Sequence, residues 1–354
     1  MFRPTPIIAI LPGAPRPDGV NMYRAYRFSF RQSLWWTRHT LAVSTVYATA
    51  MCSLAYFTGW KWFALPWQPV GLIGVALAFY LGFKNNSAYD RLWEARKIWG
   101  GMVNASRSFA VMARDFIHSG DESDALRKEV VHRHVAWLHM LTVELRKITP
   151  WEHQGKLSTA TRKRFGTAVT EDDVKAVLSE YVSEEEAQYV LGKGNRSSHL
   201  LSVQSRRLME LRETDVLDHF RHLVMQELIT EFYTLQGKAE RIKKFPLPRQ
   251  WVSANAYCIT IFAALLPFGM IDVFNRSAES WAVFLAIPAT VVCFWIFWMM
   301  DRVGEYSENP FEGLANDVPI RSMARGIEID IRQMLDETDL PPAIGNVEGT
   351  DIMV

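Results

Sequence analysis

Three bulky apolar residues spaced by four stand just before a polar block, and their chemistry suits the dehydration of a passing ion. Val75, Phe79 and Phe83 would stack along one side of a helix, because residues four apart share a face. The spacing alone is equally compatible with a plain packing face. The polar block begins at Asn85, at the edge of the apolar run. Because apolar rings opening onto wet vestibules gate some pores, we expect the three to form a neck and Asn86 to face the vestibule.

Other chemistries have weaker support in the sequence. His132 and His139 are seven residues apart, and no cysteine or close carboxylate completes a tetrahedral metal set, so we interpret these histidines as surface or intersubunit residues. Cys52, Cys258 and Cys293 lie in apolar runs and are interpreted as inert thiols. The sequence contains no Gly-rich phosphate loop, nucleophile elbow or zinc-protease motif. We therefore expect no enzyme activity, no cofactor and no metal.

The elements that would position the neck are helices long enough to cross a membrane. The mean hydropathy of −0.03 conceals four uncharged runs, at 39–60, 62–83, 250–271 and 280–300. Each run has roughly twenty residues, the length that a helix needs to cross the hydrocarbon layer. Tryptophans gather at the ends of the runs, where their rings favour the headgroup region. The sequence therefore predicts an all-α membrane protein with four transmembrane helices.

Charge predicts the orientation of these helices. The first 38 residues contain six Arg and one Asp, whereas the connections within each pair of runs carry one basic residue each. Segments rich in Lys and Arg stay on the cytoplasmic side of a membrane. We therefore expect both termini in the cytoplasm and a multi-pass protein of the cell inner membrane. No cleavable signal peptide is expected.

The expected domains follow from these runs. They are a cytosolic N-terminal segment (1–38), transmembrane helices 1 and 2 (39–83), a helical cytosolic domain (84–250), transmembrane helices 3 and 4 (251–300), and a cytosolic C-terminal segment with a mobile tail (301–354).

Within the cytosolic domain, the spacing of apolar residues predicts one long helix over 206–245. The sequence FPLPRQW (245–251) should break it with two prolines before the third span. No turn signal separates the second span from the polar block, so we expect one unbroken helix there. Its charged residues should pair within the same or a neighbouring helix, because an unpaired buried ion is costly.

Three motifs resemble the bestrophin family, in its bacterial branch. They are FYLGFKNNSAYDRLWEARKIWGGMVNASR after the second span, the proline-containing FPLPRQW, and DRVGEYSENPFEGLANDVPI at 301–320. The resemblance covers residues 20–335, with four spans in the family's order.

The resemblance implies a homopentamer around a central pore lined by the second span, with its neck at Val75, Phe79 and Phe83. It also implies a possible vestigial calcium region at Glu305, Glu308, Asn309 and Asp317. The family's run of aspartates is replaced here by EGLAND, and hard cations want six or more oxygens, so we expect little activation by calcium. A second, cytosolic constriction is placed at residues 195–201.

The expected function is a channel passing monovalent ions, with chloride or other anions favoured because aromatic edges carry partial positive charge. Two alternatives remain open. One is a cation-selective (sodium) channel of the same fold, and the other is a non-conducting membrane-anchored interaction protein. The expected partners are further copies of the chain, membrane lipids and small permeating ions, but not nucleic acid.

Overall fold

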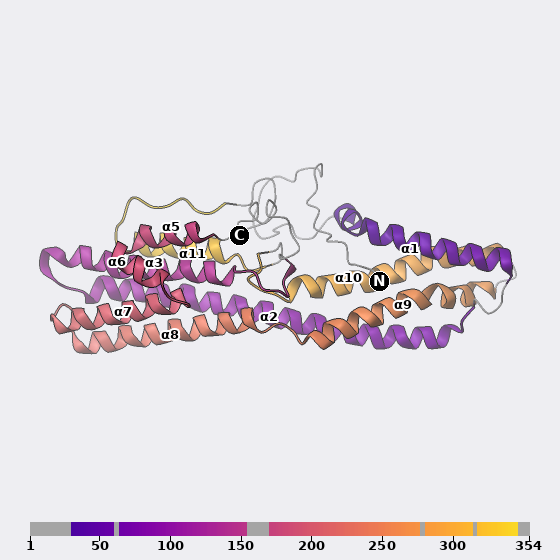
Figure 1. Cartoon of the computed structure of the whole chain (residues 1–354), viewed down its shortest axis with the longest axis horizontal. Helices are drawn as coiled ribbons and strands as arrows, with labels where there is room; N and C mark the ends of the chain where they lie inside the picture. The colour runs from indigo at the N-terminus through magenta and orange to yellow at the C-terminus, as the bar shows by residue number, and fades with distance from the viewer. Residues whose placement is uncertain (1–29, 60–63, 154–169, 277–279, 314–316, 346–354) are drawn as a thin grey trace. The chain divides into compact units, whose positions relative to one another are not determined.

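The computed structural model describes residues 30–59, 64–153, 170–276, 280–313 and 317–345. Over these ranges every regular element is a helix, and no strand occurs (Figure 1). The helices divide into two compact units, which are described separately. The described residues within 30–90 and 246–308 form the first unit, called the apolar unit. The described residues within 91–245 and 309–345 form the second, called the amphipathic unit. The all-α class expected from the sequence is confirmed.

The apolar unit is built from long helices with few charges. They are α1 (Phe30–Thr58), the first part of α2 (Trp67–Phe116), α9 (Arg249–Asn275), the 3-10 segment η4 (Ser280–Leu285) and α10 (Ala286–Ser307). Its core contains Leu77, Leu81, Phe262 and Leu266, each at most 3% exposed. Three stretches of described helix are long and apolar enough to cross a membrane, at Ser33–Thr58, within His219–Asn275 and at Ser280–Ser307. The run 62–83 is not among them.

The amphipathic unit contains the rest of α2 and the shorter helices. These are η2 (Gly120–Glu122), α3 (Ser123–Leu145), α5 (Glu171–Tyr181), α6 (Glu184–Leu191), α7 (Arg196–Glu213), α8 (His219–Lys244) and α11 (Ile320–Gln333). Helix α3 lies at its centre and contacts α5, α7, α8 and α11. Its core includes Phe109 of α2, Trp137 of α3 and Phe232 of α8.

Two helix boundaries test the sequence predictions. Helix α2 continues unbroken for 50 residues, and α8 ends at Lys244 before Pro246 and Pro248, as expected. The single helix expected over 206–245 is wrong, because α7 and α8 are separate. Asp215 takes a left-handed conformation with φ 57°, and Asp218 caps α8 by accepting the backbone N–H groups of its first turn.

Candidate functional site

Helix α2 places the apolar stripe on its exposed side. Val75 is 55% exposed, Phe79 68% and Phe83 69%, and Leu72, one turn earlier, is 71% exposed. The opposite side of the same helix is packed, with Leu77 only 2% exposed. The stripe therefore contributes nothing to the core of its own subunit, and its side chains are available to line a path or meet another surface.

The other side of α2 is held by polar contacts. Lys84 Nζ lies 2.7 Å from Asp301 Oδ1 on α10, and both side chains are less than a tenth exposed. Asn85 Nδ2 donates to the Met300 carbonyl at 3.0 Å. A Cβ atom on Gly304 would lie 2.0 Å from Asn85 Oδ1, so only glycine leaves room for that amide. These contacts fix the rotation of α2 about its axis and so keep the stripe turned outward.

Polar residues continue the exposed face beyond the stripe. Asn86 is exposed, and its Nδ2 donates to Asp90 Oδ2 at 3.3 Å. Tyr89 is 57% exposed, and Trp93, on the same face one turn further along α2, is 49% exposed. The face thus changes from apolar to mixed polar and aromatic within one turn after Phe83, which is the chemistry expected of a neck that opens into a vestibule.

The charges that follow are used inside the subunit. The Arg91 guanidinium donates to the carbonyls of Phe245 at 2.7 Å and Ile242 at 2.9 Å, which closes the C-terminus of α8. Glu94 pairs with Arg241 of α8. The expected pairing of this charged block with a neighbouring helix is therefore present, and it lies within one chain.

The residues of the possible calcium region are occupied in different ways. Asp317 accepts backbone N–H groups from Phe311 and Val318, each at 2.6 Å, and from Gly313. Arg146 Nη1 lies 2.9 Å from Asp317 Oδ2, the oxygen that also accepts from Gly313. Burial raises the pKa of Asp317, while the arginine and the backbone donors act against that rise. This carboxylate already holds a cation and three donors, so it has no oxygen left for a metal.

The other residues of the possible calcium region belong partly to one unit and partly to the other. In the apolar unit, Glu305 pairs with Arg302, and Glu308 Oε1 accepts from Arg249 Nη2 at 3.4 Å. In the amphipathic unit, Asn309 is 7% exposed. Its amide oxygen and nitrogen have no hydrogen-bond partner among the described residues. In the parts of the chain that the structure describes, no three His, Cys, Asp or Glu side chains gather as metal ligands.

The histidines do not lie where the sequence suggested. His134 is 1% exposed and lies among aromatic rings, with Nε2 2.9 Å from Ser106 Oγ. His139, at 9% exposure, meets Glu328 on α11 at 2.8 Å. Both are buried within the amphipathic unit, so the interpretation of His139 as a surface or intersubunit residue is wrong. His132 is partly exposed, and its Nε2 lies 2.8 Å from Glu337 Oε1. Burial lowers the pKa of His134 to about 3, which keeps the ring neutral.

Residues 195–201 are only partly buried in the subunit. Ser197, Leu200 and Leu201 are each at most 1% exposed, and Ser197 Oγ donates to Glu144. The other four residues are of intermediate exposure, so the second constriction in this segment stays a prediction.

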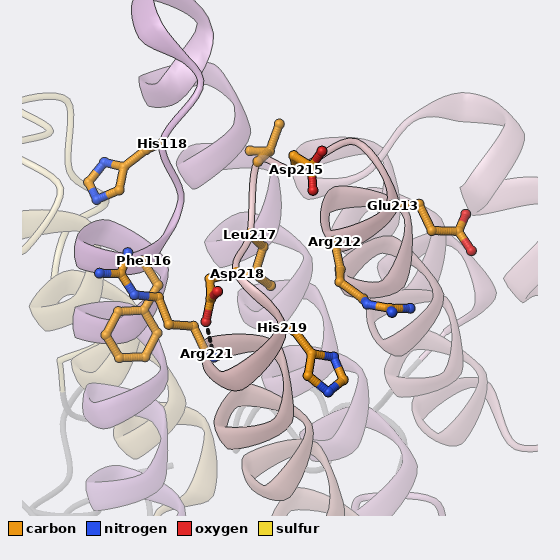
Figure 2. Close-up of a pocket in the computed structure, with 10 residues that line it drawn as sticks. Phe116, His118, Arg212, Glu213, Asp215, Leu217, Asp218, His219 and Arg221 are labelled. Carbon is orange, nitrogen blue, oxygen red and sulfur yellow. Dashed lines mark hydrogen bonds between the residues drawn. The ribbon is translucent and has the colours of Figure 1, made fainter.

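A hollow of about 590 Å³ lies where α2 ends and α7 turns into α8. Figure 2 shows Arg212, Arg221 and His219 around it, with Asp218 at its edge. The Asp218 carboxylate is used as the cap of α8, and Arg221 lies over the Phe116 ring. The basic groups are balanced by nearby acids, so we assign no function to this hollow.

Comparisons with known proteins give consistent results. A family model described as bacterial/fungal bestrophin protein matches residues 14–333. The chain is 30% identical over 305 residues to a voltage-dependent anion channel-forming protein of Mesorhizobium japonicum, covering 84% of each chain. It is 26% identical over 292 residues to the voltage-dependent anion channel-forming protein YneE of Escherichia coli K12, covering 80% of this chain and 84% of YneE.

Solved structures show the same fold. A crystal structure of a bacterial bestrophin homolog from Klebsiella pneumoniae is similar with a TM-score of 0.69 and 23% identity. It covers 84% of this chain and all of the other.

Proposed function

Because the chain belongs to the bacterial and fungal bestrophin family, we propose that it is an ion channel in which α2 helices of several copies surround a pore. The proposed assembly is a homopentamer of the cell inner membrane, with four spans per chain and both termini in the cytoplasm. In this arrangement the run 62–83 is the second span.

The observation that carries the proposal is the exposed stripe of α2. Val75, Phe79 and Phe83 are more than half exposed on a helix whose other side is firmly packed. The same face becomes polar at Asn86, one turn after the stripe ends. A dewetted neck above a wet vestibule requires such a change along one face.

The proposed selectivity is for monovalent anions such as chloride. The edges of phenylalanine rings carry partial positive charge, so rings of Phe79 and Phe83 would favour an anion that has lost part of its water. The names of the relatives point to the same ion class. A sodium-selective channel of the same fold is the second candidate, and a non-conducting membrane anchor is the third.

The test is ion flux through purified protein in liposomes, with reversal potentials measured under a salt gradient. Replacing Val75, Phe79 and Phe83 together by Ala should widen and wet the neck, so conductance should rise while the assembly keeps its size. The matched control is the triple Ala replacement of Val43, Val46 and Phe57, which are 58%, 70% and 80% exposed on α1. It should leave conductance unchanged.

Each outcome has a definite meaning. Unchanged single-channel current in the α2 triple variant would place the pore elsewhere. Intact assemblies that pass no ions at any pH or salt concentration would favour the membrane anchor. A reversal potential on the cation side would replace the anion channel by the sodium channel.

A further inference from the structure

Lys84 and Asp301 form the most deeply buried ion pair among the described residues of the apolar unit. Their side chains are 5% and 9% exposed, and Nζ lies 2.7 Å from Oδ1. Asn255 of α9 donates its amide to the same oxygen. Arg302 Nη2 lies 3.7 Å from Asp301 Oδ2, and Arg302 itself pairs with Glu305. The charges of these four side chains sum to zero.

The pair lies directly behind the stripe. Lys84 follows Phe83 in the chain, yet Phe83 is 69% exposed and Lys84 only 4%. The two side chains thus leave α2 in different directions, and the separation between ammonium and exposed face is roughly 10 Å, the diameter of a helix. The ammonium is buried, so its field persists over this distance more strongly than it would in water.

The pair also has a direction. The ammonium belongs to α2, the helix that carries the stripe, whereas the carboxylate belongs to α10 on the far side of the ammonium. The positive end of this dipole is therefore the end nearer to the stripe. In an assembly with several α2 helices around one axis, each subunit would add a contribution of the same sign.

We infer that Lys84 and Asp301 set the electrostatic potential at the neck and thereby determine how strongly the channel prefers anions over cations. The inference rests on the proposed function, because it requires the stripe to line the pore. It assigns to Lys84 a role in selectivity without contact with the ion, and to Asp301 the role of limiting the positive potential.

The two partners should have opposite effects when removed. Asp301→Asn keeps the amide contact possible but leaves Lys84 without its carboxylate, so the permeability ratio should move severalfold toward anions. Lys84→Met leaves Asp301 without its lysine and should move the ratio severalfold toward cations.

The experiment measures reversal potentials of full-length protein in planar bilayers under a potassium chloride gradient. The control is Lys244→Met, which removes a lysine of an exposed pair with Glu240 in the amphipathic unit. Its reversal potential should equal that of the wild type. A purely structural pair would alter yield or thermal stability but would not give shifts of opposite sign.

The double variant Lys84→Met/Asp301→Asn covers the case in which single variants do not assemble. It buries no unpaired charge, so it should fold, and it should lose part of the anion preference because the dipole is gone. Wild-type reversal potentials in the double variant, or in both assembled single variants, would overturn the inference while leaving the channel intact. A wild-type protein that passes no ions would refute the proposed function and this inference with it.

Discussion

The two halves of α2 use the same helix in opposite ways. In the apolar unit, phenylalanines of α2 are exposed and its lysine, Lys84, is buried. In the amphipathic unit, the aromatic residues Trp99 and Phe109 are fully buried, and Arg96 and Lys97 are exposed. The second half follows the ordinary rule for a helix at a water surface, whereas the first half reverses it.

The reversal indicates what each half faces. A helix that exposes phenylalanine and buries a paired lysine gains nothing from contact with bulk water on its outer face. Lipid, another copy of the chain or a dewetted path would each suit that face, and the polar continuation at Asn86 favours the path. The comparison thus locates the change of environment on one face of one helix, between Phe83 and Asn86.

The largest expected difference between the halves concerns the same substitution at two positions. Phe109 is fully buried, so Phe109→Ala should lower the free energy of unfolding by about 3–5 kcal/mol. Phe79 is 68% exposed, so Phe79→Ala should change it by less than about 1 kcal/mol. Thermal melting of detergent-solubilised protein would measure both. Equal losses would mean that Phe79 is packed in the assembly as firmly as Phe109 is in the core.

The second prediction tests the buried polar side of the first half. Gly304→Ala would place a Cβ atom 2.0 Å from Asn85 Oδ1, so it should cost about 1–3 kcal/mol through forced displacement of that amide. Gly326 on α11 is the matched control, because a Cβ there would meet nothing within 4 Å. Gly326→Ala should stabilise its helix by roughly 0.5–1 kcal/mol. A tolerated Gly304→Ala would show that Asn85 does not hold α2 in place.

The third prediction uses pH. His134 packs against Phe109 of α2 and is neutral in the folded protein, because burial lowers its pKa from 6.5 to about 3. On unfolding below pH 6.5 the ring takes up a proton, so acid favours the unfolded state, by roughly 2 kcal/mol at about pH 5.

This pH dependence can be separated from that of other groups. His134→Gln should remove the contribution of this histidine to the pH dependence of the free energy of unfolding. That contribution lies between pH 6.5 and about pH 3, the pKa values of the unfolded and folded states. His118→Gln, at an exposed position, should keep the slope of the wild type. An unchanged slope in His134→Gln would mean that the ring is already charged in the fold.

The smallest expected effect is that of calcium. Asp317 is filled by Arg146 and three backbone donors, so adding or chelating calcium should leave the open probability nearly unchanged. Single-channel recordings with buffered calcium would measure this. Steep activation at micromolar calcium would show that Glu305, Glu308 or Asn309 contributes to a site whose ligands the present contacts do not bring together.

Local signals in the sequence predicted the features that depend on neighbours along the chain. The lack of a Gly-Pro turn at Lys84 predicted the continuous α2, and the prolines of FPLPRQW predicted the break after α8. The spacing of Val75, Phe79 and Phe83 predicted that they share a face, but only the packing of α2 shows that this face is exposed.

Features that depend on distant partners left no such signal. Lys84 and Asp301 are 217 residues apart, so nothing in either segment indicated the pair. Arg146 is 171 residues from Asp317, and the arginine that fills this carboxylate could not be foreseen from the motif around it. The break between α7 and α8 was missed because a left-handed Asp215, rather than Gly or Pro, makes the turn.

Because α2 is one unbroken helix, it tolerates few insertions or deletions of single residues. Each residue turns a helix by about 100°, so one residue inserted after Phe83 would rotate the stripe by more than a quarter turn relative to the buried positions that follow. Leu77, before the insertion, or Lys84, after it, would then leave its partners, whichever part of the helix stayed in place. Substitutions in α2 can be absorbed one side chain at a time, but a single-residue insertion or deletion cannot. We therefore expect an insertion scan of 67–116 to be tolerated only near its ends.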